Sequence, residues 1–116
     1  MPMPLTDYIS TLRENPSALT FEDTLAVIDG HYDFTPRAFK NGPVDNAAGT
    51  NNGSCKVFSF AVLHELTPAQ TLAMFAQHYQ NVLDEPNGEA HANIRAFMKY
   101  GFDGVVFEGE ALKLKS

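Results

Sequence analysis

Residues 54–66, SCKVFSFAVLHEL, form the most continuously apolar stretch of the chain. Apolar residues on every side of such a stretch predict that it is buried, but periodicity alone does not separate a buried strand from a buried helix. The length of about a dozen residues and Ser54 as an N-cap favour a helix, whereas Val57–Phe60 is rich in residues typical of strands. We predict a central helix here, which other elements must cover on all sides.

The flanking sequence contains the spacing of amphipathic helices. We predict helices over residues 5–12, 21–28, 67–83 and 90–100. Thr20 is the expected N-cap of the second of these helices, and Gly101 is the expected C-cap of the last. Thr67 and Gln70 form a capping box with Pro68 at the first helical position, which makes 67–83 the clearest helix.

The remaining segments are short or rich in turn residues. Thr35-Pro36 predicts a short helical turn that Asn41-Gly42 closes, and residues 43–53 predict one long loop. Residues 105–107 and 112–114 alternate weakly and predict a small C-terminal β-hairpin that is stable only when packed on the helices.

The predicted fold class is therefore mainly α. We expect a single compact domain over residues 1–116, with about five helices around the central apolar helix and a small C-terminal β-hairpin. Residues 1–4 and 115–116 are expected to be flexible ends.

The composition excludes several classes of protein. With 44% hydrophobic and 19% charged residues the chain is typical of globular domains. A single cysteine excludes an intramolecular disulfide and a cysteine-rich zinc site. The net charge of -6 and the scattered Lys and Arg residues argue against nucleic acid and anionic membranes as partners.

The N-terminal sequence bears on localisation. MPMPLTDYISTLRENP lacks a basic region followed by an apolar run, so it does not resemble a cleaved signal peptide. No window has the eighteen or more apolar residues of a membrane span. We expect a cytoplasmic protein, or one exported without a cleaved signal.

Cys55 is the first candidate for chemistry. A thiol in the first turn of a helix lies near free N–H groups and the positive end of the helix dipole, which favour the thiolate. Such a nucleophile also needs a histidine base within reach. The alternative is that Cys55 is a small buried side chain, which is the usual role of a free cysteine.

A second candidate is a site for a small anion. HANIR places His91 and Arg95 one turn apart on a helix, with Asn93 on a neighbouring face. Residues 51–53 could form an anion-accepting turn at the start of the central helix. In the alternative interpretation both segments are ordinary turns and solvated helix faces.

Two metal-like patterns are not convincing. Asp29, His31 and Asp33 have the alternate spacing of some metal loops but lack further ligands. HELTP has Pro68 where a zinc protease motif needs its second histidine. We predict no metal site.

Four separated blocks together resemble one family. They are FEDTLAVIDGHYDFTP at 21–36, NGSCKVFSFA at 52–61, TLAMFAQHY at 71–79 and HANIRAFMKYGFDGVVFEG at 91–109. This series resembles the HopJ type III effector family over residues 5–112, with Phe102 where a tryptophan is common. The resemblance implies a small, mostly helical bacterial protein and brings with it no enzymatic activity, cofactor or catalytic residue.

The site hypothesis comes from polar residues within these blocks. They are Glu22, Asp23, Asp29, Tyr32, Asn52, Ser54, Cys55, Lys56, His91, Asn93 and Arg95. Our first hypothesis is an effector-like protein of unknown biochemical activity that binds a protein partner or a small anionic ligand without a cofactor, and that a type III system could export.

The alternative is a small enzyme or anion-binding protein. Its site would join the helix start at residues 52–56 to His91 and Arg95. Cys55 and His91 are then the catalytic candidates, and the ligand-binding candidates are Asn52, Ser54, Lys56, Asn93 and Arg95.

Overall fold

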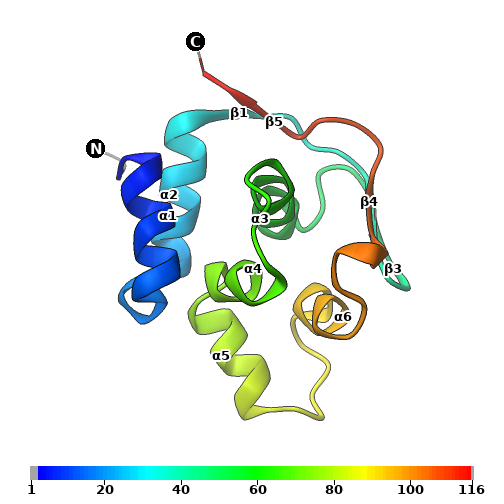
Figure 1. Cartoon of the computed structure of the whole chain (residues 1–116). Coiled ribbons are helices and arrows are strands. Elements are labelled where there is room, and N and C mark those ends of the chain that lie inside the picture. The colour runs from blue at the N-terminus through cyan, green and yellow to red at the C-terminus, as the bar shows by residue number, and fades with distance from the viewer. Residues whose placement is uncertain (1–2, 116) are drawn as a thin grey trace.

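The apolar segment is a helix at the centre of the molecule. The structure is a computed structural model that describes residues 3–115. Helix α3 (Asn52–Leu63) lies in the middle of Figure 1, with other elements on every side. The middle of the helix has no room for solvent on any side, since Val57, Phe58, Phe60 and Ala61 are fully buried. The predicted central helix is confirmed, and its strand-typical residues Val57–Phe60 are accommodated because this part of the helix is covered on all sides.

Helices account for most of residues 3–115. The other α-helices are α1 (Leu5–Glu14), α2 (Phe21–His31), α4 (Pro68–Met74), α5 (Gln77–Asp84) and α6 (Ala92–Tyr100), and η1 (Pro16–Ala18) and η2 (Gly101–Gly104) are short 3-10 turns. Helices α1 and α2 lie side by side at the left of Figure 1, and α4, α5 and α6 lie below α3. A mainly helical fold is therefore correct.

Two helix starts are capped as predicted. The Thr20 hydroxyl accepts from the Asp23 N–H at 3.1 Å, and the Asp23 carboxylate accepts from the Thr20 N–H at 3.0 Å. Thr67 and Gln70 make the same reciprocal pair at the start of α4. These boxes satisfy N–H groups that have no partner within the helix.

The predicted single helix over 67–83 is wrong. It breaks into α4 and α5 at Ala76, whose backbone has φ 51° and ψ −117°. The break allows Phe75 to pack against Phe58 of α3, with ring centroids 5.5 Å apart, and to stack on Phe21 of α2. These tertiary contacts override the local helical period.

The β-structure differs from the predicted hairpin. The strands are β1 (Tyr32–Phe34), β2 (Phe39–Asn41), β3 (Val44–Asn46), β4 (Val105–Phe107) and β5 (Leu112–Leu114). All pairs are antiparallel: β1 pairs with β5, and β2 lies between β3 and β4. Strands β4 and β5 therefore belong to different sheets, so the predicted C-terminal hairpin is wrong.

The segment around β2 also differs from the prediction. Residues 39–41 are a strand rather than the end of a helical turn, and residues 44–46 form a strand within the predicted loop 43–53. Phe39 stacks on Phe107 of β4 with ring centroids 5.1 Å apart. Gly42, at φ 59°, makes the turn between β2 and β3 where a Cβ would meet the Tyr100 ring. Contacts with residues distant in the sequence therefore determine that residues 39–41 and 44–46 form strands.

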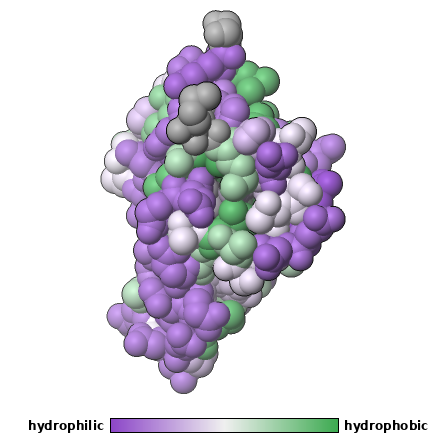
Figure 2. Space-filling model, turned by 90° about the vertical axis from the view of Figure 1, so that its left-hand side faces the viewer, coloured by the Kyte–Doolittle hydropathy of each residue, from purple (hydrophilic) through white to green (hydrophobic). Residues whose placement is uncertain are grey.

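The outer face over α1 and α2 is mixed in character. Figure 2 shows a band of hydrophobic residues through its middle, with hydrophilic residues over most of its lower half. Beneath it, the fully buried Tyr8 hydroxyl bonds the Thr24 hydroxyl at 2.7 Å, and Thr24 donates to the Met74 carbonyl at 2.9 Å. This chain of bonds joins α1, α2 and α4.

The chain ends were expected to be flexible. The Met3 carbonyl contacts His31 Nε2 at 2.9 Å, and the Lys115 N–H donates to the His31 carbonyl at 3.1 Å. The expectation for residues 1, 2 and 116 lies outside the described residues. Within residues 3–115, no helix is both long enough and apolar enough to cross a bilayer.

Candidate functional site

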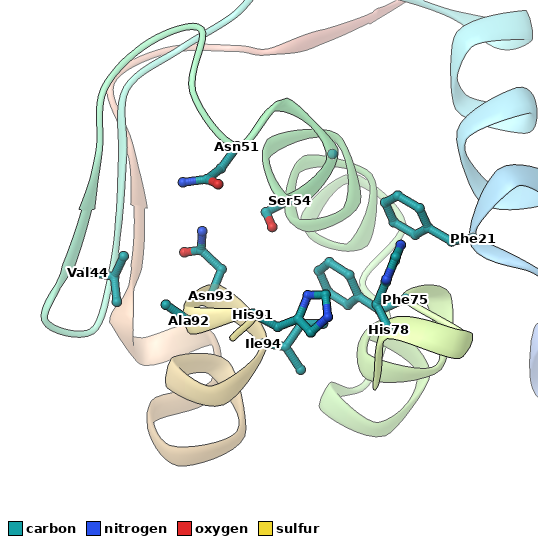
Figure 3. Close-up of a pocket in the computed structure, with 11 residues that line it drawn as sticks. Phe21, Val44, Asn51, Ser54, Phe75, His78, His91, Ala92, Asn93 and Ile94 are labelled. Carbon is teal, nitrogen blue, oxygen red and sulfur yellow. The ribbon is translucent and has the colours of Figure 1, made fainter. Parts of the chain in front are cut away.

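A pocket of about 360 Å³ lies where the starts of α3 and α6 approach each other. Figure 3 shows Asn51 and Ser54 on the α3 side, with Ala92 and Asn93 of α6 opposite them, His91 beside Ile94 and His78 beside Phe75. The lining residues are Phe21, Val44, Asn51, Gly53, Ser54, Phe75, His78, His91, Ala92, Asn93 and Ile94.

The start of α3 is open toward this pocket. Asn51 precedes the helix in the left-handed region at φ 49°, and no side chain caps the first turn. The Asn51 amide donates instead to Asn46 Oδ1 at 2.7 Å. The first-turn N–H groups at Gly53 and Ser54, which have no partner inside the helix, therefore lie free at the pocket wall.

The start of α6 has the same arrangement. His91 precedes the helix at φ 58°, and no side chain caps it. Both α2 and α4 have full capping boxes, so this sequence is able to cap a helix with its own side chains. The starts of α3 and α6, which it leaves without a side-chain cap, both present N–H groups and the positive ends of helix dipoles at the pocket.

Asn46 of β3 holds the two open helix starts together. Its Oδ1 accepts from Asn51 at 2.7 Å and from Asn93 at 2.9 Å, and its amide donates to Asn93 Oδ1 at 3.1 Å. Asn41 adds a bond to the Asn93 carbonyl at 2.8 Å. Because Asn41, Asn46 and Asn93 are all buried, this amide cluster fixes the relative positions of α3 and α6.

Two histidines complete the polar part of the pocket. The His78 and His91 rings lie with centroids 5.1 Å apart and planes inclined by 45°. His78 Nδ1 is buried and has no hydrogen-bond partner among the described residues. Phe21 meets the His78 ring edge-on at 4.7 Å. Within the described structure, none of the lining residues is Asp, Glu, Lys or Arg.

Several unusual backbone conformations lie at or beside the same pocket. Among residues 3–115, four non-glycine residues have positive φ: Asn51, Glu65, Ala76 and His91. Asn51 and His91 line the pocket, and Ala76 lies between its lining residues Phe75 and His78. Such backbone conformations cluster at functional sites because the surrounding structure must hold them in place.

Comparison with known proteins identifies the family. Residues 5–112 match the family described as HopJ type III effector protein, which is nearly the whole chain.

This chain belongs to the HopJ family.

A solved structure of similar sequence has the same fold. The crystal structure of VPA0580, a protein of unknown function, is 46% identical and superposes with a TM-score of 0.97. The match covers 99% of this chain and 97% of that one. No curated protein matches the chain. The biochemical activity of this HopJ protein must therefore be argued from its own geometry.

The pocket of this HopJ protein contains three of the residues proposed from sequence. Ser54, His91 and Asn93 line it, and Asn52 is the exposed first residue of α3. Arg95 does not line it: Nε donates to the Ala90 carbonyl at 2.6 Å and Nη1 to the Pro86 carbonyl at 3.3 Å. Arg95 therefore stabilises the loop before α6.

Lys56 and Cys55 also lie away from the pocket. Lys56 Nζ is 2.8 Å from an Asp29 carboxylate oxygen and lies over the Phe34 ring. Cys55 is 1% exposed, and its Sγ lies 3.9 Å from the Arg37 carbonyl. Burial raises the pKa of the Cys55 thiol, so its surroundings disfavour the thiolate that the helix start was expected to favour.

The residues of the metal-like pattern are engaged elsewhere. Asp29 pairs with Lys56, and His31 contacts the Met3 carbonyl. Among residues 3–115, no three His, Cys, Asp or Glu side chains form a group that could hold a metal ion.

Sequence reasoning missed His78, Phe21, Phe75 and Asn46. His78 and Phe75 reach the pocket because the helix breaks at Ala76, and no Gly or Pro marks that break. Asn46 lay in a segment predicted to be a loop, where an asparagine is ordinary. Of the segments that line the pocket, the sequence indicated only the helix starts at residues 51–54 and 91–93.

Proposed function

We propose that this HopJ protein acts by binding a small anionic ligand in the pocket between α3 and α6. One observation carries the proposal: His78 and His91 face each other in a carboxylate-free cavity onto which two uncapped helix starts open. The cavity of about 360 Å³ has the size of a small-molecule site.

The donors in this pocket suit an oxyanion such as a phosphate group. Backbone N–H groups at helix starts are a common way to bind phosphate, and the helix dipoles add attraction for negative charge. The Ser54 hydroxyl and the two imidazoles are further donors along the wall. Phe21 and Phe75 form an apolar wall against which the body of a phosphate ester could pack.

The same geometry supports binding over covalent catalysis. A thiol nucleophile must reach its substrate, whereas Cys55 is buried and does not line the pocket. His91 is paired with His78 instead of a thiol. His91 is therefore proposed as a ligand-binding residue, together with Ser54 and the backbone of residues 53–54 and 92–93.

Calorimetric titration with inorganic phosphate and phenyl phosphate tests the proposal. Wild type is expected to bind one anion per chain, with phenyl phosphate tighter because its ring packs on the apolar wall. In the variant Ser54→Asp, a carboxylate occupies the first turn of α3, where it suits the helix dipole but repels the ligand. We expect this variant to keep its thermal stability and to lose binding.

Ser17→Asp is the matched control, since it adds the same charge at an exposed site on η1. It should bind as wild type does. Absence of binding by wild type at millimolar anion, or equal binding by Ser54→Asp and Ser17→Asp, would contradict the proposal.

A protein partner is a separate hypothesis. Leu83 and Met98 are 46% and 44% exposed and line a groove between α5 and α6. Exposed apolar side chains of this kind are a feature of partner surfaces. Crosslinking of the purified chain with bacterial and host extracts, compared with a Leu83→Ser, Met98→Ser variant, tests whether this groove holds a partner.

Export is proposed from the family alone. HopJ is described as a type III effector family, and such export would need no cleaved signal. Fusion of residues 1–20 to a reporter, followed by a secretion assay in competent and secretion-deficient strains, tests the idea. Equal reporter release from both strains would contradict it.

A further inference from the structure

The pocket contains a pair of neighbouring histidines, His78 and His91. His78 belongs to α5 and His91 immediately precedes α6, so the two rings come from segments that meet only in the folded chain. Figure 3 shows both rings at the same side of the pocket, below Phe21. Their centroids lie 5.1 Å apart, close enough for a charge on one ring to be felt by the other.

We propose that His78 and His91 make anion binding depend on protons, so that the pocket binds a doubly charged oxyanion more tightly when the pair is protonated than when it is neutral. The inference rests on the proposed function and names the class of ligand and the condition for its binding. Histidine is the side chain whose charge ordinarily changes between about pH 5 and 8.

The charges around the pair support this assignment. The pocket wall contributes no carboxylate that could neutralise protonated imidazoles. On α2, the Glu22 carboxylate is held by the Gln77 side chain at 2.9 Å, and on α6, Arg95 is bonded to the carbonyls of Ala90 and Pro86. Glu89, two residues before His91, is exposed.

Two protonated rings in this position would repel each other and would also face the positive ends of α3 and α6. A bound dianion relieves that repulsion, and the protons in turn strengthen the contact with the ligand. Because both rings line the pocket, a ligand oxygen within it could accept a hydrogen bond from a protonated imidazole. Binding and proton uptake must then be linked in both directions.

Calorimetry with sulfate tests the proposal, because sulfate remains a dianion from pH 5.5 to 8 and does not itself add a pH dependence. Wild type should lose about tenfold in affinity between these pH values, equivalent to about 1.4 kcal/mol. At pH 6, titrations in buffers of different ionisation enthalpy should show net proton uptake on binding.

The variants His78→Gln and His91→Asn test the assignment to this pair. Asn is chosen at residue 91 because it tolerates the positive φ found there. Each variant removes one imidazole from the pocket wall, so it should bind more weakly than wild type at both pH values. The ratio of its affinities at pH 5.5 and pH 8 should also be smaller than the wild-type ratio of about ten. An equal fold loss of affinity at both pH values, which leaves the wild-type ratio unchanged, would show only a structural role and would overturn the inference. His31→Gln, remote from the pocket, is the control and should keep the full pH dependence.

Other outcomes separate this inference from the proposed function. Binding of sulfate with the same affinity at pH 5.5 and 8 overturns the proton linkage and leaves the anion site intact. A pH dependence of binding that persists when His78→Gln and His91→Asn are combined in one chain assigns the proton linkage to other groups. That result also overturns the inference. If no anion binds at either pH, the proposed function fails and the inference fails with it.

Discussion

Asn46 is the residue on which the geometry of the pocket most depends. Its buried amide bonds Asn51 before α3 and Asn93 within the first turn of α6. A cap made by Asn51 would close the start of α3, but the bond to Asn46 engages that side chain. The same residue therefore braces two helices and leaves the N–H groups of α3 available to a ligand.

Removal of this amide should weaken both stability and binding. Asn46→Ala leaves buried partners unsatisfied, which costs about 1–3 kcal/mol in the free energy of unfolding. Urea denaturation measures the loss, and phosphate titration measures the weaker binding. Asn81→Ala, an exposed position on α5, is the control. Equal stability of the two variants would contradict the role given to Asn46.

Cys55 should be unreactive in the folded protein. Burial raises its thiol pKa, so at pH 8 the thiolate is scarcer than for a free cysteine and is also shielded from reagents. We expect labelling by a thiol-specific disulfide reagent to be about a hundredfold slower in buffer than in urea, because it requires local opening. Labelling as fast in the native protein as in urea would show that the thiol is accessible.

At the scale of elements, local signals predicted some features and failed on others. The capping box of Thr67 and Gln70 and the N-cap Thr20 were predicted because each depends only on residues within one helical turn. Strands β1, β2 and β3 were missed because each has three residues, too few for a visible alternation. The strands predicted at 105–107 and 112–114 are present, but they do not pair with each other because β5 pairs with β1 from the far end of the chain. Asn51 rather than Ser54 precedes α3, because the amide cluster holds Asn51.

The break between α4 and α5 is strained at Ala76. Its φ of 51° and ψ of −117° suit glycine, so Ala76→Gly should raise the free energy of unfolding by about 1 kcal/mol. Ala26→Gly, in the exposed middle of α2, should lower it by about 1 kcal/mol. Chemical denaturation of both variants gives the comparison. A loss of stability in Ala76→Gly would show that the strain there is small.

The packing of α1 on α2 should make the fold sensitive to alkaline pH. Burial raises the pKa of Tyr8 from 10.0 to about 12, so the folded chain retains this proton after the unfolded chain has lost it. The resulting stability is complete below pH 10 and is lost as pH rises toward 12, by about 3 kcal/mol in all.

Denaturation at pH 9 and pH 11 tests this prediction on wild type and Tyr8→Phe. The variant should be about 1 kcal/mol less stable at pH 9, where it lacks the bond to Thr24. Its further loss by pH 11 should be smaller than that of wild type. Equal losses in the two proteins would assign the alkaline sensitivity to other groups.

For the whole molecule, the sequence predicted the central helix and the family, whereas the pocket required the structure. Ser54, Asn93 and His91 could be proposed because each lies at a helix start that the sequence marks. His78 could not, because it reaches the pocket through a break that no Gly or Pro marks. Cys55 and Arg95 were placed near the site by sequence spacing, but their side chains point to other partners.

The most direct test of the anion site is an amide NMR titration of the labelled chain with phosphate at pH 6. Saturable shifts are expected, concentrated on the N–H signals of Gly53, Ser54, Ala92 and Asn93. The side-chain signals of His78 and His91 should move with the same affinity. Shifts confined to surface lysines such as Lys99 and Lys113, or no saturation at millimolar phosphate, would contradict it.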